Sequence, residues 1–287
     1  MDERTLEEQI SALDDARALV AWSDLRLTSV VGTDARRWLH DLVTADIAGL
    51  EAFSVRRCLL LTPSGHIRAD VHVYGMEDGT FVLAQSADQP APVADLLEPY
   101  VLSSEVGLEP CPLGVLSVPG PWAVPAELPA IWSPSVLGDG FDVLGPGEEL
   151  AAARRLLSED RVEVSARAVE AWRILRGLPR FPVDVDQTSV PAEAGLDETV
   201  DTTKGCFLGQ ESVAKIRNLG HPPRVVLALH ADGPVAPGAT VDAAGERAGL
   251  VTSATPDGRG GTALLGRVRW ERRQGALTAS GLRLERV

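Results

Sequence analysis

The pattern of apolar and polar residues along the 287-residue chain predicts helices and strands in mixed order. Residues 5–20 place Thr5 and Glu8 at capping-box spacing ahead of an apolar-periodic run, which predicts a helix. Residues 25–31 are typical of a strand. The following stretch predicts a second helix, because its apolar residues recur on one helical face: Ala35, Trp38, Leu39, Leu42 and Val43.

Residues 55–62 and 67–74 predict a β-hairpin, because Pro63-Ser64-Gly65 between them has the composition of a tight turn. The second strand alternates, so residues of even number lie on the face opposite Ile67. That face carries four groups able to hydrogen bond: Arg68, Asp70, His72 and Tyr74. The pattern favours the solvated side of an antiparallel sheet and leaves a ligand site as the alternative.

A strand at residues 81–85 and a helix at 93–101 predict a second sheet-plus-helix block, so the architecture is expected to repeat. Residues 107–148 are rich in proline and glycine, which indicates a module boundary or an irregular crossover. Helices are expected next at 150–157 and at 166–176. Ser165 would cap the latter, and Gly177 with Pro179 would end it.

Beyond Pro222-Pro223, short apolar runs separated by glycine and proline predict a small β-barrel. These runs are residues 224–231, 248–255, 262–270 and 277–287. The expected fold class is α+β. A duplicated sheet-plus-helix region would occupy residues 1–220, with a break near 105–148, and a C-terminal β-barrel would occupy residues 221–287.

Composition and charge narrow the class of protein. A hydrophobic content of 45% is enough for a substantial core, and the net charge of -14 argues against strong nucleic-acid binding. The acidic start of the chain and the absence of a long apolar run predict a cytoplasmic protein with no direct membrane contact. The three cysteines are widely spaced, which indicates neither a disulfide framework nor a self-contained metal or iron–sulfur site.

Common catalytic signatures are absent from the sequence. It contains no G-x-S-x-G elbow, no phosphate-binding G-x-x-x-x-G-K-[ST] and no H-E-x-x-H. The five histidines have no metal-ligand spacing, so no metal site is predicted. Nucleotide and metal enzymes of the common kinds are therefore disfavoured.

The segment DTTKGCFLGQES, residues 201–212, is the strongest candidate for function. It contains Lys204, one of only two lysines in a chain with 25 arginines, two residues before Cys206. An ammonium near a thiol favours the thiolate. Cys58 lies among apolar strand residues and is expected to be buried, and Cys111 lies in a proline-rich segment with no predicted role. The residues alone leave a functional and a structural Cys206 both open.

The sequence KGCFLGQE resembles the signature K-G-C-[FY]-x-G-Q-E of the YgfZ family, which is related to mitochondrial iron–sulfur assembly factors and to the aminomethyltransferases of glycine cleavage. Every specified position matches: Lys204, Gly205, Cys206, Phe207, Gly209, Gln210 and Glu211. Residues 32–47, 61–74 and 172–196 and the expected barrel extend the similarity over nearly the whole chain.

The resemblance implies a folate-binding region followed by a barrel, with tetrahydrofolate or a derivative as cofactor. It implies that Cys206 is the reactive or ligand-contacting thiol and that the other six motif positions, with Asp70, contact the cofactor. Arg217 and Arg224 would bind the carboxylates of the glutamate tail, although both would also suit an ordinary surface. The implied role is an accessory protein for iron–sulfur client or assembly proteins that affects tRNA modification, and not a conventional enzyme.

Two other functions remain open. A folate-dependent aminomethyltransferase would share Lys204, Phe207, Gly209 and Glu211, whereas Gly205, Cys206 and Gln210 are typical of the YgfZ family. Those enzymes carry paired aspartates where this chain has Ala69-Asp70, and a pterin-binding glutamate where it has Leu175. A folate-binding module without chemistry is the third possibility. Lys204 and Glu211 could also pair with each other to hold the loop.

Overall fold

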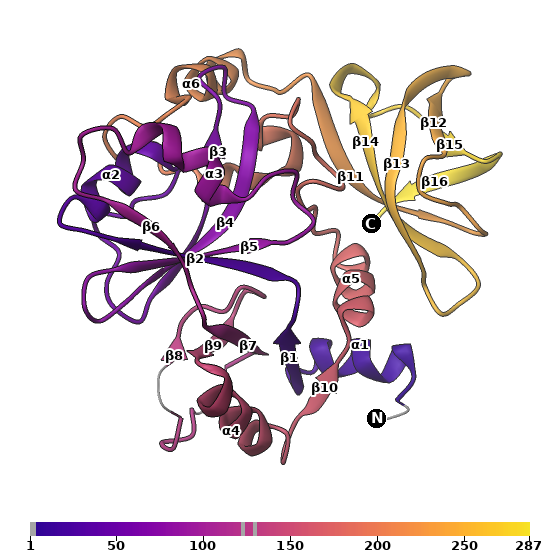
Figure 1. Cartoon of the computed structure of the whole chain (residues 1–287). Helices are drawn as coiled ribbons and strands as arrows, with labels where there is room; N and C mark the ends of the chain where they lie inside the picture. Colours follow the sequence, from indigo (N-terminus) through magenta and orange to yellow (C-terminus); the bar gives the residue numbers. More distant parts are fainter. Residues whose placement is uncertain (1–3, 122–123, 129–130) are drawn as a thin grey trace. The chain divides into compact units, whose positions relative to one another are not determined.

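The computed structural model describes residues 4–121, 124–128 and 131–287, which divide into two compact units (Figure 1). The first unit comprises Met1–Leu61, Arg68–Ala168 and Thr199–Leu208, and the second comprises Thr62–Ile67, Val169–Glu198 and Gly209–Val287. Each unit is built around hydrophobic clusters of its own. Within the described ranges, no helix is both long enough and apolar enough to cross a membrane.

The first unit contains a five-stranded sheet of strand order β3-β4-β5-β2-β6. Its strands are β2 (Leu25–Val31), β3 (Val55–Leu61), β4 (Ile67–Gly75), β5 (Phe81–Ser86) and β6 (Gly107–Pro110). Helices α2 (Ala35–Leu42) and α3 (Val93–Leu97), with the 3₁₀ turn η1 (Glu98–Tyr100), supply the apolar residues that pack on it. Ala69, Val71 and Val73 of β4 face this cluster, as the alternation of the strand predicts.

A second five-stranded sheet in the same unit has the order β10-β1-β7-β9-β8. Its strands are β1 (Ala18–Trp22), β7 (Gly114–Pro119), β8 (Ile131–Trp132), β9 (Gly140–Gly145) and β10 (Val162–Val164). Helix α1 (Leu6–Asp14) packs near β1 and β10, and helix α4 (Gly147–Leu157) packs on β7 and β9. The two sheets with their helices confirm the α+β class.

Three details of the sequence prediction were wrong. Residues 18–22 form the strand β1, because α1 ends at Asp14 and the chain turns through Ala16 at φ 56°. The described part of residues 107–148 contains four strands, of which β6 joins the first sheet and β7, β8 and β9 make up three of the five strands of the second. Strand β5 belongs to the first sheet, so residues 81–101 do not begin a separate block. Proline and glycine in 107–148 mark the turns between short strands.

The face of β4 opposite the helices is only partly solvated, because Asp70 and Tyr74 are buried and Arg68 and His72 are half-buried. Asp70 is 9% exposed and Tyr74 is fully buried, in a cluster that includes Val115 and Trp132 of the second sheet. The hydroxyl of Tyr74 donates a 2.7 Å hydrogen bond to Asp142, which also accepts from Ser117, Ser135 and the backbone of Val136. Burial raises the pKa of Asp142, and this hydrogen-bonded set satisfies its buried carboxylate.

The second unit contains the C-terminal barrel, which is closed in the order β11-β14-β13-β12-β15-β16 and confirms the expectation (Figure 1). Its strands are β11 (Arg224–Ala231), β12 (Thr240–Ala243), β13 (Glu246–Pro256), β14 (Thr262–Arg269), β15 (Leu277–Ala279) and β16 (Leu282–Arg286). The 3₁₀ turn η4 (Trp270–Arg272) follows β14 directly. Most of α5 (Ala166–Leu175), the 3₁₀ turns η2 (Pro191–Ala194) and η3 (Leu196–Thr199), and α6 (Gln210–Leu219) precede the barrel.

A buried ionic network joins α5 to the barrel within the second unit. Arg173 of α5 donates a 2.8 Å hydrogen bond to Asp184, and both side chains are almost fully buried. The hydroxyls of Thr252 and Ser253 in β13 donate to the other carboxylate oxygen of Asp184 at 2.6 and 2.7 Å. Asp184 is therefore the common acceptor that holds the segment after α5 against β13.

We expect Asp184→Ala to lower the free energy of unfolding by about 3–5 kcal/mol, because it removes the buried acceptor of Arg173, Thr252 and Ser253 and leaves the guanidinium with only the partly exposed Glu170 as a carboxylate partner. Urea unfolding followed by circular dichroism measures the change. Asp197→Ala removes an exposed carboxylate from the same unit and is the matched control. Equal stability of the two variants would contradict a stabilising role for the network.

Candidate functional site

The segment that leads into the sequence KGCFLGQE, residues 204–211, here named the KGC motif, is attached to the end of α2 in the first unit. The hydroxyl of Thr44 donates to the carbonyl of Thr199 at 2.7 Å, and the amide of Asp201 donates to the carbonyl of Thr44 at 2.9 Å. The Asp201 carboxylate then accepts hydrogen bonds from the backbone amides of Thr203 and Lys204, at 2.8 and 3.1 Å. This aspartate turn fixes the backbone immediately before the motif.

Lys204 binds the backbone where α2 ends. Its ammonium donates hydrogen bonds to the carbonyls of Val43 at 2.6 Å and Ala45 at 2.8 Å, and to that of His40. Carbonyls at a helix C-terminus lack intrahelical partners and carry partial negative charge, so a cation there is favoured. An ammonium has three N–H donors, and all three are used. A pairing of Lys204 with Glu211 would require one of these bonds to break.

The two residues after Cys206 are also anchored. Phe207 is 9% exposed, and the centre of its ring lies 5.4 Å from the Lys204 ammonium. Leu208 packs against the core of the first sheet. Cys206 itself is exposed, so the backbone displays this thiol between the half-buried Lys204 and two packed side chains.

The motif glycines differ in what they do for the fold. Gly209 has φ 86° and caps the N-terminus of α6 in the left-handed conformation, which side chains rarely adopt. Gly205 has no such requirement, and a Cβ added there would meet nothing within 4 Å. The described structure therefore explains Gly209 but gives no packing reason for Gly205, which precedes the exposed thiol.

The other two thiols differ from Cys206 in exposure. Cys58 is completely buried in β3 and Cys111 is half-buried. Burial raises the pKa of the Cys58 thiol, and the positive charge of Lys204 only partly offsets this. Lys204 is itself partly buried, and this loss of solvent lowers the pKa of its ammonium to about 8. The electrostatic effect expected of Lys204 on a thiol thus falls on Cys58.

Asp70 is held in β4 by an arginine that sequence reasoning missed. Arg57 of β3 donates to both carboxylate oxygens, at 3.0 and 2.6 Å, while Gln89 exchanges two hydrogen bonds with the Asp70 backbone. Burial opposes ionisation of Asp70, but the charge and hydrogen bonds of Arg57 outweigh it and lower the pKa. Burial also lowers the pKa of the neighbouring His72 to about 4. Asp70 is therefore an ionised hydrogen-bond acceptor and a weak base.

The remaining predicted residues belong to the second unit. Gln210 and Glu211 lie in the first turn of α6, and Arg217 lies exposed in its last turn. Arg224, at the start of β11, donates to both carboxylate oxygens of Glu193 at 2.9 and 3.2 Å. Because Glu193 is buried, the Arg224 guanidinium has a defined structural partner.

Metal ligands do not gather anywhere in the ranges 4–121, 124–128 and 131–287, where no group of three or more histidine, cysteine, aspartate or glutamate side chains could hold an ion. Cys206 is thus a single displayed thiol in the described part of the chain. Its chemistry is that of one nucleophile or one ligand.

Comparison with known proteins finds several to which this chain is similar. Residues 2–125 match the family model described as the GCVT N-terminal domain. An aminomethyltransferase of Rubrobacter xylanophilus is 27% identical over 253 residues, which cover 78% of this chain and 68% of the relative. The tRNA-modifying protein YgfZ of an Enterobacter species is 25% identical over 230 residues, covering 72% of this chain and 70% of the relative.

A mitochondrial iron–sulfur cluster assembly factor IBA57 homolog of Pyricularia oryzae is 27% identical over 209 residues, covering 68% of this chain. The matched region spans 52% of the length of that homolog and 64% of the length of another curated relative. The crystal structure of the glycine cleavage system aminomethyltransferase T from Bartonella henselae superposes with a TM-score of 0.81 at 22% identity, covering 98% of this chain and 88% of that one, and shows the shared fold.

Residues 2–125 are thus similar to the GCVT N-terminal domain, and the chain is similar over most of its length to YgfZ and aminomethyltransferase proteins. In this chain, the structure brings Lys204 and Phe207 into contact and places Cys206 outside them. Asp70 lies in the same unit on β4, in its pair with Arg57.

Sequence reasoning missed the partners of these residues. Asp201 carries a readable signal, because aspartate followed by two threonines is typical of a side-chain-capped turn. Arg57 was readable only from the register of β3 against β4, and Glu193 lies 31 residues from Arg224 without a motif that connects them. Partners that are backbone carbonyls, as for Lys204, have no sequence signal.

We expect Lys204→Met to lower the free energy of unfolding by about 2–4 kcal/mol, because the variant loses charge-assisted hydrogen bonds to three carbonyls. Lys215→Met is the matched control, since Lys215 is the only other lysine and is exposed, so its loss should cost no more than about 0.5 kcal/mol. Urea unfolding measures both. A Lys204→Met protein as stable as the control would show that the three bonds contribute little.

Proposed function

We propose that this protein is a tetrahydrofolate-binding accessory protein for the assembly, maintenance or repair of iron–sulfur enzymes, with Cys206 as its functional thiol. The observation that carries the proposal is the placement of Cys206. Lys204, Phe207 and Leu208 are bound or packed around it, yet the thiol is exposed. A segment anchored this firmly would keep the thiol available to a partner without a change in fold.

The buried carboxylate of Asp70, a hydrogen-bond acceptor, supports tetrahydrofolate or a derivative as the cofactor. A pterin ring needs acceptors for its N–H groups in a largely apolar surrounding. The carboxylate of Asp70 is ionised and buried, and each of its oxygens keeps acceptor capacity beside its bond from Arg57. Asp70 would therefore accept hydrogen bonds from the ring. Bound tetrahydrofolate would supply a reduced pterin that carries one-carbon units.

In the second unit, arginines are the proposed partners for the carboxylates of the glutamate tail. Arg217 is exposed and suits this role directly. Arg224 would have to share its guanidinium with Glu193, which already accepts two of its hydrogen bonds. Of the motif residues there, Gln210 and Glu211 remain proposed cofactor contacts, and Gly209 would act by shaping the start of α6.

The presence of a single exposed thiol implies that any iron–sulfur cluster would be bound together with a partner protein. One cysteine cannot hold a cluster, because each cluster needs several thiolate ligands. Cys206 would therefore act on a client or assembly protein that supplies the other ligands. Gly205 supports this, since the absence of a side chain beside Cys206 has no packing reason in the described structure and would let a partner approach the thiol closely.

The match to the GCVT N-terminal domain favours an aminomethyltransferase-like one-carbon transferase as the second candidate. Such a reaction needs a general base near the cofactor. Asp70 is a weak base because Arg57 lowers its pKa, and Leu175 stands where the resemblance places a glutamate in the transferases. These two residues favour the accessory role.

In a strain that lacks the protein, we expect wild type to restore the activity of iron–sulfur enzymes under oxidative stress and Cys206→Ala to restore at most about a tenth of it. Cys111→Ala is the matched thiol control. It should behave as wild type, because Cys111 is half-buried and lies outside the motif in the sequence. The readouts are aconitase-type activity and the methylthio modification of tRNA. Gly205→Ala should fold normally and lose part of the activity.

Each other outcome favours a different function. Full complementation by Cys206→Ala would contradict a functional thiol and would leave a folate-binding module without chemistry. A deletion with no effect on iron–sulfur enzymes would contradict the accessory role. Formation of methylenetetrahydrofolate from an aminomethyl donor and tetrahydrofolate by the purified protein would establish the transferase.

A further inference from the structure

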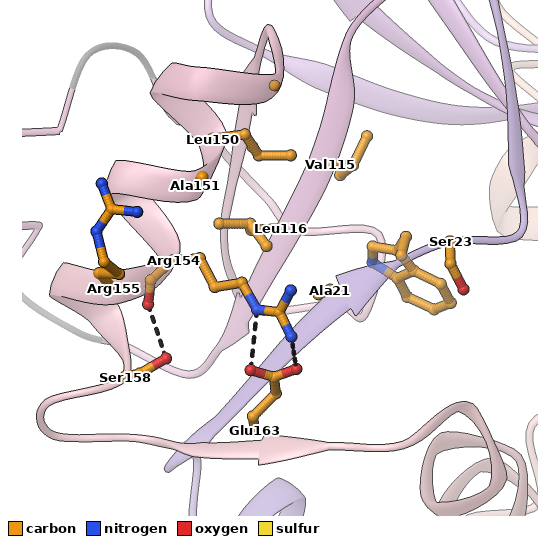
Figure 2. Close-up of a pocket in the computed structure, with 12 residues that line it drawn as sticks. Ala21, Ser23, Val115, Leu116, Leu150, Ala151, Arg154, Arg155, Ser158 and Glu163 are labelled. Carbon is orange, nitrogen blue, oxygen red and sulfur yellow. Dashed lines mark hydrogen bonds and ion pairs between the residues drawn. The ribbon is translucent and has the colours of Figure 1, made fainter. Parts of the chain in front are cut away.

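A cavity of about 670 Å³ lies in the first unit, where the strands β2 and β6 meet helix α3 and the turn η1. Its volume is in the range of sites that bind small molecules. Another cavity of this unit, shown beside α4 in Figure 2, has its arginine Arg154 already paired with Glu163. In the cavity at β2, by contrast, three polar side chains lack partners among the described residues.

The first of these side chains is Thr28 of β2, which lines the cavity from the sheet. It faces the helices, as does Val30 two residues later in the strand, and it is only 8% exposed. Its hydroxyl makes no hydrogen bond within the described ranges and is not fully enclosed, so it opens onto the cavity. A hydroxyl withdrawn from bulk water without a partner costs free energy, so this atom favours a ligand that hydrogen bonds to it.

Apolar side chains form the walls around Thr28. Leu108 of β6 packs against the core on the same face of the sheet, and Pro110 shares that face because it lies opposite Thr28 in the strand register. Ala94 of α3 and Pro99 of η1 line the cavity from the helical side. These groups would surround the aliphatic part of a ligand.

Two other residues border the cavity without directing their side chains into it. Leu27 packs with the cluster on the opposite face of the sheet. Glu109 is paired with Ser29 and so belongs to that opposite face too, and a Cβ on Gly107 would lie 3.8 Å from one of its carboxylate oxygens. The Glu109 carboxylate therefore lies beside its own strand and not in the cavity.

The second and third unpartnered side chains are the carboxylates of Asp95 in α3 and Glu98 in η1. They are three residues apart, which makes them neighbours on one helical face beside the cavity. Both are exposed, and neither carboxylate forms an ion pair or a hydrogen bond with a residue that the structure describes. Like charges placed in this way repel each other, and a cation bound between them relieves the repulsion.

The charge at the cavity is negative and is not balanced locally. No lysine, arginine or histidine lines it within the described part of the chain, whose net charge is -14 overall. Arg26 lies on the same face of β2 as Thr28, but it donates to the carbonyl of Gln89 at 3.1 Å and does not border the cavity. The cavity thus attracts a cation and repels an anion.

We propose that this cavity binds an aliphatic guanidinium compound. The guanidinium donates to the carboxylates of Asp95 and Glu98 and to the hydroxyl of Thr28, and the aliphatic stem lies against Leu108 and Pro110. A planar guanidinium has five N–H donors, pairs well with carboxylates and is more weakly hydrated than an ammonium, so it suits a partly apolar cavity better. Recognition thus requires a positive charge, several donors and a short apolar stem.

The test titrates the full-length, isotope-labelled protein with butylguanidinium and with its uncharged isostere butylurea, and follows backbone amide shifts by NMR spectroscopy. We expect butylguanidinium to cause saturable shifts of the Thr28 and Asp95 amides, and butylurea to bind at least tenfold more weakly. Butylammonium has the same charge and stem but fewer donors, so it should bind at least threefold more weakly than butylguanidinium.

Variants test the individual groups. Glu98→Gln should weaken butylguanidinium about tenfold and leave butylurea unchanged. Glu109→Gln removes the same charge from a carboxylate that lies outside the cavity, so it should change the affinity less than threefold. Thr28→Val removes only the hydroxyl and should weaken butylguanidinium at least threefold. Because that hydroxyl is unpaired before the ligand binds, this variant should unfold at or above the wild-type temperature.

Several results would overturn the proposal. These are equal binding of the three probes, equal effects of the two glutamate variants, unchanged binding by Thr28→Val, shifts confined to residues outside the cavity, or no binding at tens of millimolar butylguanidinium. None of these results depends on folate or iron–sulfur activity.

Discussion

The ammonium of Lys204, bound by three backbone carbonyls, is the interaction on which the proposed site depends. It satisfies carbonyls that the end of α2 leaves unpaired and joins residues 40–45 to a segment about 160 positions later in the chain. A compact ammonium with three donors suits three converging carbonyls better than a flat guanidinium. This explains a lysine at this position in a chain that otherwise uses arginine almost throughout.

The same anchoring determines which thiol is available. Cys58 is near enough to Lys204 to feel its charge, but burial outweighs that charge and raises the pKa of the thiol. Cys206 is exposed, because the segment turns outward between Lys204 and Phe207. The fold thus sequesters one cysteine as a core side chain and displays another. The proposed accessory function needs only the displayed one, since a partner would supply any further ligands.

Two buried aspartates outside the proposed site are satisfied in different ways. Asp184 and Asp142 are both completely buried, yet the first has an arginine partner and the second has only hydroxyl and amide donors. Asp184 secures α5 to the barrel, and Asp142 connects the two sheets of the first unit through Tyr74 and Ser117. The indole N–H of Trp22 donates to Ser117 and so joins the Asp142 network.

Much of the fold was predictable from sequence because its apolar periodicity is strong. The helix with Trp38 and Leu39, the hairpin of β3 and β4, and the barrel strand at 224–231 follow their patterns closely. Strand β1 was not predictable, because ALVAW has no alternation and no glycine marks the turn at Ala16. Helix α6 was also missed, since it buries no residue fully and so has no clear apolar stripe.

The candidate site was predictable in its residues but not in its contacts. The motif identified Lys204 and Cys206, and composition marked the lysine as unusual. Nothing in the sequence indicated that the ammonium would bind carbonyls rather than influence the neighbouring thiol, because backbone acceptors are the same at every position. Long-range pairs such as Arg224 with Glu193 have the same difficulty, since either residue alone is typical of a surface.

The most direct test of the account is the rate at which each cysteine of the native wild-type protein is alkylated by iodoacetamide, measured peptide by peptide by mass spectrometry. The account predicts that Cys206 is modified at least tenfold faster than Cys58, with Cys111 between them. Equal rates for the three cysteines after unfolding in urea would confirm that the fold causes the difference. A native Cys206 as slow as Cys58 would contradict the claim that the Lys204 anchor displays this thiol.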